Sequence, residues 1–171
     1  MIIVNTGDGK GKTTASIGQI IRSLGHGNKV CLIQLFKGKY FYGEQNILTE
    51  LEGLEFFSFA SEHPYCIEGI TLEEAKEKCI PAAQKLAELA ASEKRYDLIV
   101  LEEFNIALRD GFLDKIKFID LVKKLSEKSD IVITGRAAPQ ELIDIADLVT
   151  EMKEIKHPFQ KGISAKKGIE F

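Results

Sequence analysis

The most specific local signal in this chain is the run Gly7-Asp8-Gly9-Lys10-Gly11-Lys12-Thr13-Thr14. An apolar segment, residues 2–4, precedes this run, and a helical spacing of apolar residues follows it. A glycine-rich turn between a strand and a helix lets several backbone N–H groups point at one anion, with the helix N-terminus behind them. The whole run is therefore predicted to bind nucleotide phosphates, with Lys12 reaching the outer phosphates and the Thr13 hydroxyl binding Mg²⁺.

The loop departs from the usual pattern GxxxxGK[ST] at one position. Thr6 stands where the first glycine belongs, and Gly7 follows one residue late. The path of the backbone within the loop is therefore expected to be unusual. A mobile surface turn is the alternative, but the strand, the glycines, the Lys-Thr pair and the helix occur in the order that a phosphate loop requires.

Length and composition indicate one domain spanning residues 1–171, because 44% apolar residues are enough for one substantial core. The net charge is only −3 and basic residues form no long run, which argues against nucleic acid as a partner. No apolar stretch is long enough for a membrane span and no basic leader opens the chain, so a cytoplasmic protein is expected. Three widely spaced cysteines, Cys31, Cys66 and Cys79, predict neither a disulfide framework nor a zinc site.

Outside the loop, short apolar runs alternate with helical spacings along the whole chain. Strands are predicted over residues 2–4, 30–36, 54–59, 97–101, 131–134 and 148–152. Helices are predicted over residues 17–24, 43–51, 72–89, 113–125 and 139–146, with Pro81 as a kink or break. The alternation predicts an α/β fold with a doubly wound, mostly parallel sheet. Together with the phosphate loop, it indicates the P-loop NTPase (RecA-like) architecture in a single domain.

Two further polar groups follow predicted strands, and ligands bind at that edge of open parallel sheets. Glu102 and Glu103 follow the strand at 97–101, from which a carboxylate can hold Mg²⁺ directly or through water. Arg136 follows the strand at 131–134, where its guanidinium is placed to clamp phosphate oxygens. The alternatives are two solvated acids where a strand emerges and, for Arg136, a surface ion pair.

Several motifs together resemble the P-loop type of ATP:corrinoid adenosyltransferase, and they run in order over nearly the whole chain. They are residues 6–14, Leu24-Gly25-His26-Gly27, Gln34-Leu35-Phe36-Lys37-Gly38, Gly43-Glu44-Gln45-Asn46, Leu101-Glu102-Glu103, Thr134-Gly135-Arg136-Ala137-Ala138-Pro139, residues 146–152, residues 156–163 and Gly168-Ile169-Glu170-Phe171. The displaced Gly7 is itself a mark of this family. The resemblance implies a transferase that moves the 5′-deoxyadenosyl group of ATP to the cobalt(I) of a corrinoid and releases inorganic triphosphate, in adenosylcobalamin synthesis or salvage.

The resemblance also implies roles for individual residues. Lys12 and Arg136 would be the catalytic residues that stabilise negative charge on the departing triphosphate, aided by Mg²⁺ bound to Thr13, Glu103 and Glu102. Cobalt supplies the nucleophile, so no general base is needed. ATP would lie in the loop in the reverse sense to most such proteins. A flavoprotein reductant and a homodimer are further expectations, the homodimer by analogy.

For the corrinoid, the resemblance implies aromatic side chains wedged beneath the ring, and Phe59 and Tyr65 are the candidates here. The alternative places Phe59 at the end of a buried strand and Tyr65 over the edge of the core. The chain departs from the family in three ways. The family usually has Asp where Glu102 stands, its corrinoid loop commonly pairs Phe with Trp, and many members have a helix before the first strand; this chain has no Trp and its sequence opens on the strand.

Two other functions remain open from the sequence. An ordinary P-loop ATPase or phosphotransferase would release ADP, whereas the adenosyltransferase releases triphosphate. A non-catalytic ATP- or corrinoid-binding relative would bind Mg-ATP without turnover. His26 and His157 match family positions, but a histidine whose ring pairs with a neighbouring backbone group is the favoured interpretation of each.

Overall fold

A computed structural model of the chain describes residues 1–38, 42–60, 63 and 70–171. Its strands are β1 (Ile2–Thr6), β2 (Val30–Leu35), β3 (Leu54–Phe59), β4 (Leu98–Glu102), β5 (Asp130–Thr134) and β6 (Leu148–Glu151). Its helices are α1 (Lys12–Leu24), α2 (Gly43–Leu48), α3 (Leu72–Ala91), α4 (Phe104–Arg109), α5 (Lys115–Ser126), α6 (Gln140–Ile145) and the short 3-10 helix η1 (Pro158–Lys161). Each strand and helix predicted from the sequence corresponds to one of these elements.

The six strands form one sheet in the order β3-β2-β4-β5-β1-β6, and every neighbouring pair is parallel. The prediction of a doubly wound parallel α/β sheet is confirmed. Strand β5 lies between β1 and β4, although all three are far apart in sequence. The phosphate loop after β1 and the carboxylates at the end of β4 therefore lie at one edge of the sheet, with the end of β5 between them.

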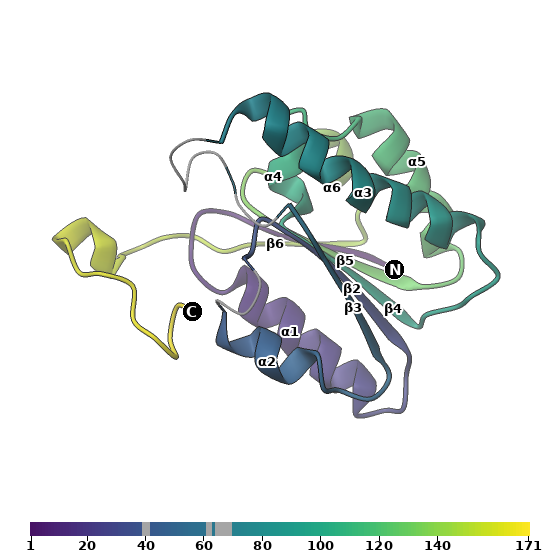
Figure 1. The fold of residues 1–171 in the computed structure, drawn as a ribbon, viewed down its shortest axis with the longest axis horizontal. Helices are drawn as coiled ribbons and strands as arrows, with labels where there is room; N and C mark the ends of the chain where they lie inside the picture. The colour runs from purple at the N-terminus through teal and green to yellow at the C-terminus, as the bar shows by residue number, and fades with distance from the viewer. Residues whose placement is uncertain (39–41, 61–62, 64–69) are drawn as a thin grey trace.

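Helices cover both faces of this sheet (Figure 1). Helices α1 and α2 pack on one face, where Ile20 and Leu48 meet Leu32 and Val100. Helices α3 to α6 pack on the other face, over the alternate residues of the same strands. Because both faces are covered, β2 is buried along its whole length and its sequence is apolar with a single exception, Gln34. Among the described residues, no helix is long and apolar enough to cross a membrane.

The structure differs from the predictions in two helices. Helix α4 was not predicted, because six residues are too short to show a helical period. Pro81 was predicted to kink or break α3, and the helix continues through it, so it does not break there. A capping box between Thr71 and Glu74 begins α3, and buried residues on both sides of Pro81, such as Ala75 and Leu86, hold the helix on the core.

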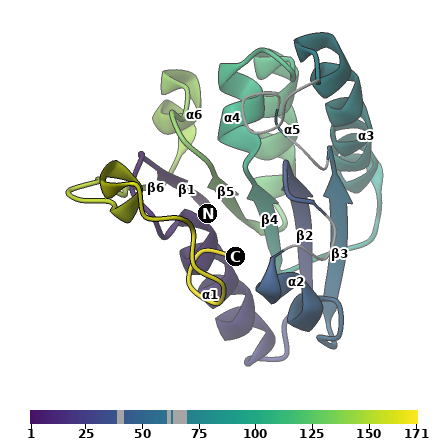
Figure 2. The ribbon, with the colours of Figure 1, turned by 60° about the vertical axis from the view of Figure 1, so that its left-hand side comes forward.

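After β6 the chain leaves the sheet and folds back toward the start of α1 (Figure 2). This C-terminal segment, residues 152–171, contains η1, which was not predicted, and its side chains are exposed or half-buried. The segment therefore adds little to the core. It contributes instead to one wall of the pocket described below.

Candidate nucleotide site

The phosphate loop packs closely against the end of β6. The Gly9 N–H donates to the Met152 carbonyl at 2.7 Å, and the Met152 N–H donates to the Thr6 carbonyl at 2.8 Å. A Cβ added to Gly7, which has a φ of 92°, would lie 2.5 Å from the Met152 carbonyl oxygen, and one on Gly9 would lie 2.7 Å from it. Both positions therefore require glycine, and Gly7 stands where this contact needs it. The displaced glycine of the sequence pattern is explained by the neighbouring strand.

Lys12 begins α1 and is directed back into the loop. Its side chain is buried, and its Nζ donates to the Gly7 carbonyl at 2.6 Å and to the Gly9 carbonyl at 2.7 Å. Burial lowers the pKa of Lys12 below its usual value, and the charge of Glu103 opposes this effect. The ammonium thus lies within the loop that is predicted to surround the phosphates.

Glu102 is the acceptor of three hydroxyl groups. Thr13 Oγ1 donates to its Oε1 at 2.5 Å, while Ser16 Oγ and Thr134 Oγ1 donate to its Oε2 at 2.8 and 2.7 Å. The side chain is 1% exposed, so Glu102 is not a solvated surface acid. Because the Thr13 proton is directed at Glu102, the oxygen lone pairs of Thr13 remain available to other partners.

Glu103 lies beside this group but has a different environment. Its backbone has a left-handed φ of 65°, and its N–H donates to Thr134 Oγ1 at 3.1 Å. Its Oε2 atom is buried and has no hydrogen-bond partner among the described residues. A Cβ added to Gly135 would lie only 3.3 Å from that oxygen, so Gly135 leaves room for it. Burial, followed by the charge of Glu102, raises the pKa of Glu103 to about 7.

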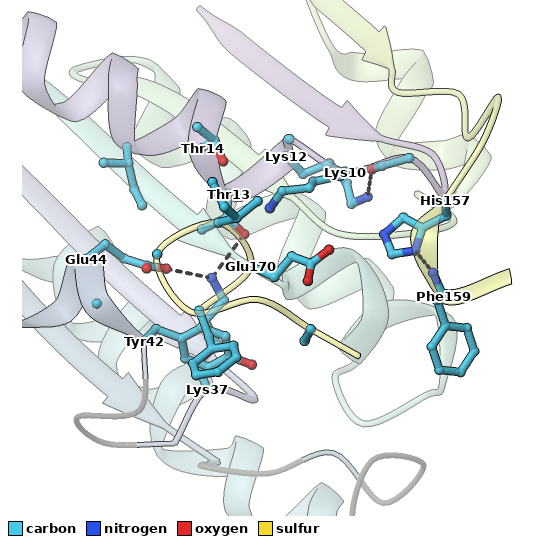
Figure 3. A pocket seen from close by; sticks show the side chains of 18 of the residues that line it. Lys10, Lys12, Thr13, Thr14, Lys37, Tyr42, Glu44, His157, Phe159 and Glu170 are labelled. Atoms are coloured by element: carbon cyan, nitrogen blue, oxygen red, sulfur yellow. Dashed lines mark hydrogen bonds and ion pairs between the residues drawn. The ribbon is translucent and has the colours of Figure 1, made fainter. Parts of the chain in front are cut away.

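Lys37, just beyond the end of β2, is the site residue to which no role was assigned from the sequence. Its buried Nζ donates to Thr13 Oγ1 at 3.0 Å and lies 3.5 Å from a Glu44 oxygen (Figure 3). The same ammonium lies 3.6 Å from a Glu102 oxygen. The ammonium also lies 4.9 Å from the centre of the Tyr42 ring. Only the resemblance, which includes residues 34–38 and 43–46, pointed to this part of the chain.

Lys12, Thr13, Lys37 and Glu103 line one pocket of about 700 Å³, and Gly7 and Glu102 are not among its described lining residues. Arg136 lines it together with the loop, so the structure brings this predicted residue to the site. The described lining residues other than Arg136 are Asp8 to Thr14, Ile17, Lys37, Tyr42, Gly43, Glu44, Glu103 and, from the C-terminal segment, His157, Phe159, Ile163, Ala165 and Gly168 to Phe171. The phosphate loop and the residues near it thus give the pocket charged side chains, and the C-terminal segment adds apolar side chains together with His157 and Glu170 (Figure 3).

The family described as ATP:corrinoid adenosyltransferase BtuR/CobO/CobP matches residues 1–171. The chain belongs to this family. A corrinoid adenosyltransferase of Sinorhizobium sp is 38% identical over 178 residues, covering 100% of this chain and 80% of the relative. The corrinoid adenosyltransferase of Pseudomonas aeruginosa is 36% identical over 177 residues (100% and 83%), and the corrinoid adenosyltransferase CobA of Salmonella typhimurium is 33% identical over 175 residues (100% and 85%).

Membership of the adenosyltransferase family confirms the resemblance, the fold and the transferase class predicted from the sequence. The alternative of an ordinary P-loop ATPase or phosphotransferase is not favoured. The His157 ring was expected to pair with a neighbouring backbone group. It does so, because its Nδ1 accepts the Phe159 N–H at 3.3 Å and caps η1.

Of the two corrinoid candidates of this adenosyltransferase, the structure describes only Phe59, and it does not bring Phe59 to the pocket. Phe59 is the last residue of β3, is half-buried and packs against the core, and it is not among the described residues that line the pocket. Tyr65 lies outside the described residues. His63, between them in sequence, is buried, bonds Asp110 at 3.0 Å and makes an edge contact with the Phe36 ring at 4.9 Å.

The oxygen groups near Thr13 suit Mg²⁺. Among the described residues no three His, Cys, Asp or Glu side chains form a metal cluster. Mg²⁺ in nucleotide sites needs no such cluster, since it takes one or two protein oxygens together with substrate phosphates and waters. The buried Glu103 Oε2, which has no hydrogen-bond partner, and the Thr13 hydroxyl are of the chemical type that this ion prefers.

Proposed function

We propose that this chain transfers the 5′-deoxyadenosyl group of ATP to the cobalt(I) of a corrinoid and releases inorganic triphosphate. The observation that carries the proposal is one pocket that combines the loop, Lys12, Thr13, Glu103 and Arg136 in a chain of the adenosyltransferase family. The charged side chains around the phosphate loop suit a triphosphate, and the apolar side chains of the C-terminal segment suit a nucleoside.

The reaction is a substitution at the 5′ carbon. Cobalt(I) donates an electron pair to form the cobalt–carbon bond, the carbon–oxygen bond to the α-phosphate breaks, and that bond's electron pair leaves with triphosphate. The protein contributes position and charge: the loop N–H groups, Lys12 and Arg136 stabilise negative charge on the departing group. No residue has to remove a proton.

Mg²⁺ is the ion that we assign to this site. Thr13 and Glu103 would bind it, and Glu102 would orient the Thr13 hydroxyl through the bond between them. When bound, the ion adds positive charge beside the phosphate oxygens. Phe59 and Tyr65 remain candidates for the corrinoid wedge. A flavoprotein reductant, a homodimer and a cytoplasmic location are further proposals that rest on the family resemblance.

One assay tests the reaction. The purified chain is mixed with Mg-ATP and chemically reduced cob(I)alamin, adenosylcobalamin is followed by absorbance, and the phosphate product is identified. We expect adenosylcobalamin and triphosphate in equal amounts. ADP as the product would indicate phosphoryl transfer, and tight Mg-ATP binding without turnover would indicate a non-catalytic relative.

The matched variant in this assay is Lys12→Ala. Because a charge-assisted contact to phosphate is lost, Mg-ATP binding should weaken by roughly 1.5–3 kcal/mol, measured by calorimetry, and turnover should disappear. An exposed lysine of α5, Lys117, provides the control, since Lys117→Ala removes the same charge far from the pocket. Unchanged ATP affinity in Lys12→Ala would contradict the assignment of the loop.

A further inference from the structure

The site contains a second buried lysine that the proposed chemistry does not use. Lys37 reaches three oxygen groups, on Thr13, Glu44 and Glu102, while Lys12 is occupied by the carbonyls of its own loop. Both lysines are among the charged side chains that line the pocket, but they hold different partners. Of the two lysines, Lys37 is the one that contacts the Thr13 hydroxyl, which is assigned to the metal.

The Thr13 hydroxyl cannot easily serve Lys37 and Mg²⁺ at once. Its proton is donated to Glu102, so its oxygen binds cations only through lone pairs, and one of these accepts from Lys37 at 3.0 Å. Mg²⁺ binds oxygen at about 2.0–2.1 Å. A dication at that distance repels an ammonium that is bound to the same oxygen.

We propose that Lys37 holds the cation position beside Thr13 and Glu102 until Mg²⁺ displaces it, and that the displaced ammonium then pairs with the bound triphosphate. This inference rests on the proposed function. Lys37 lines the pocket, and its ammonium also contacts Glu44 and the Tyr42 ring there. A lysine can make this movement because its ammonium is a point charge on a flexible four-carbon stem.

The arrangement keeps the site balanced in charge in either state. Without metal, the ammonium at 3.6 Å compensates the buried Glu102 carboxylate. With metal and nucleotide, the same ammonium is free to offset negative charge on the phosphates. Lys37 would then be a catalytic residue for the leaving group, in addition to Lys12 and Arg136.

The test compares Lys37→Met with Lys37→Arg and with the exposed control Lys117→Met. Mn²⁺ serves as the metal probe, counted by electron paramagnetic resonance in the nucleotide-free protein. Loss of the competing ammonium should tighten Mn²⁺ binding about tenfold in Lys37→Met, while Lys37→Arg and Lys117→Met stay near wild type. Tripolyphosphate is the second probe, and at saturating Mg²⁺ its affinity should fall about tenfold in Lys37→Met. The inference would be overturned if Lys37→Met bound Mn²⁺ more weakly than wild type. It would also be overturned if the Mn²⁺ and tripolyphosphate affinities of this variant both stayed within twofold of wild type.

The wild-type chain offers an independent readout if Lys37→Met does not fold. Lys37 is acetylated with an amine-reactive acetylating reagent, and the rate of its acetylation is measured by mass spectrometry with and without Mg²⁺. A displaced ammonium should react several-fold faster when Mg²⁺ alone is added, and an unchanged rate would refute displacement. These measurements need no corrinoid, so a chain that passes them without forming adenosylcobalamin would contradict the proposed function alone.

Discussion

At the scale of single residues, the two adjacent carboxylates have different environments because β4 ends between them. Glu102 is the last residue of the strand and accepts three hydroxyl protons. Glu103 turns into a left-handed conformation and leaves one buried oxygen without a hydrogen-bond partner. One carboxylate therefore builds the site, and the other is available to a ligand.

This difference predicts opposite outcomes for the two amide variants. Glu102→Gln places an N–H₂ group against hydroxyl donors, so it should lower the free energy of unfolding by about 1–3 kcal/mol, measured with urea. Glu103→Gln should fold normally but raise the Mg²⁺ concentration needed for ATP binding, and by more than Glu102→Gln does. Equal and negligible effects of both variants would show that neither carboxylate has the role assigned to it here.

The raised pKa of Glu103 predicts a dependence of stability on pH. A carboxyl with a pKa of about 7 in the folded protein and an ordinary one of 4.5 holds its proton more tightly when folded. Between pH 4.5 and 7 the folded state therefore binds more protons than the unfolded state, and stability falls as pH rises through this range. A glutamine at this position has no proton to lose in this range, so Glu103→Gln does not lose this stability as pH rises.

In EDTA, the free energy of unfolding of Glu103→Gln should therefore rise relative to that of wild type by on the order of 2 kcal/mol between pH 4.5 and 7. Urea unfolding of both proteins at each pH measures this difference. Glu141→Gln is the control, because Glu141 is an exposed acid of α6 away from the pocket. A difference between Glu103→Gln and wild type that stays constant over this range would show that Glu103 titrates normally.

At the scale of elements, β6 determines the shape of the phosphate loop. Gly7 and Gly9 lie so close to the backbone of Met152 and Lys153 that neither position has room for a Cβ atom. Gly18 in α1 is different, since a Cβ there would meet nothing within 4 Å. The chain thus contains glycines that the fold requires and others, such as Gly18, that it does not.

Gly7→Ala and Gly18→Ala should therefore have opposite effects. Gly7→Ala must move either the loop or β6, because the added carbon would lie 2.5 Å from the Met152 oxygen, so both Mg-ATP affinity and melting temperature should fall. Gly18→Ala should stabilise α1 by roughly 0.8–1.0 kcal/mol and leave ATP binding unchanged. Calorimetry and thermal unfolding of both variants check this, and normal ATP binding by Gly7→Ala would contradict the loop geometry.

At the scale of the whole molecule, the pocket joins segments from both ends of the chain. The C-terminal segment supplies Ile163, Ile169 and Phe171 to the pocket wall but no buried residue to the core. The C-terminal segment therefore contributes to the nucleotide site without contributing buried side chains to the core of the sheet.

Removing residues 163–171 should separate nucleotide binding from the stability of the sheet. The melting temperature should change by only a few degrees, because the core clusters contain none of these residues. The affinity for Mg-ATP should fall by about 1–2 kcal/mol, as expected when an apolar wall is lost, while tripolyphosphate binding should change little. Ile116→Ser, on the exposed face of α5, is the control for loss of surface apolar area. Equal losses for ATP and tripolyphosphate would show that the segment acts on the phosphate end instead.

The sequence by itself determined the features that are local or periodic. The phosphate loop, the alternation of strands and helices, and the place of Glu102 and Glu103 at the end of β4 could all be predicted, because each depends on neighbouring residues. The family followed from several such runs in order, and it is confirmed. Helix α4 could not be predicted, because it is too short to show a period.

Only the tertiary structure decided how these pieces meet. Strand β5 pairs between β1 and β4, and that pairing places Thr134 against Glu102. Lys37 joins Thr13 because β2 lies beside β4, and Met152 explains Gly7 because β6 lies beside β1. Hydrophobic periodicity reports that a strand is buried but not which strand lies next to it, since that choice depends on packing between distant segments. The residues of the site are therefore local in the sequence, whereas its contacts belong to the fold.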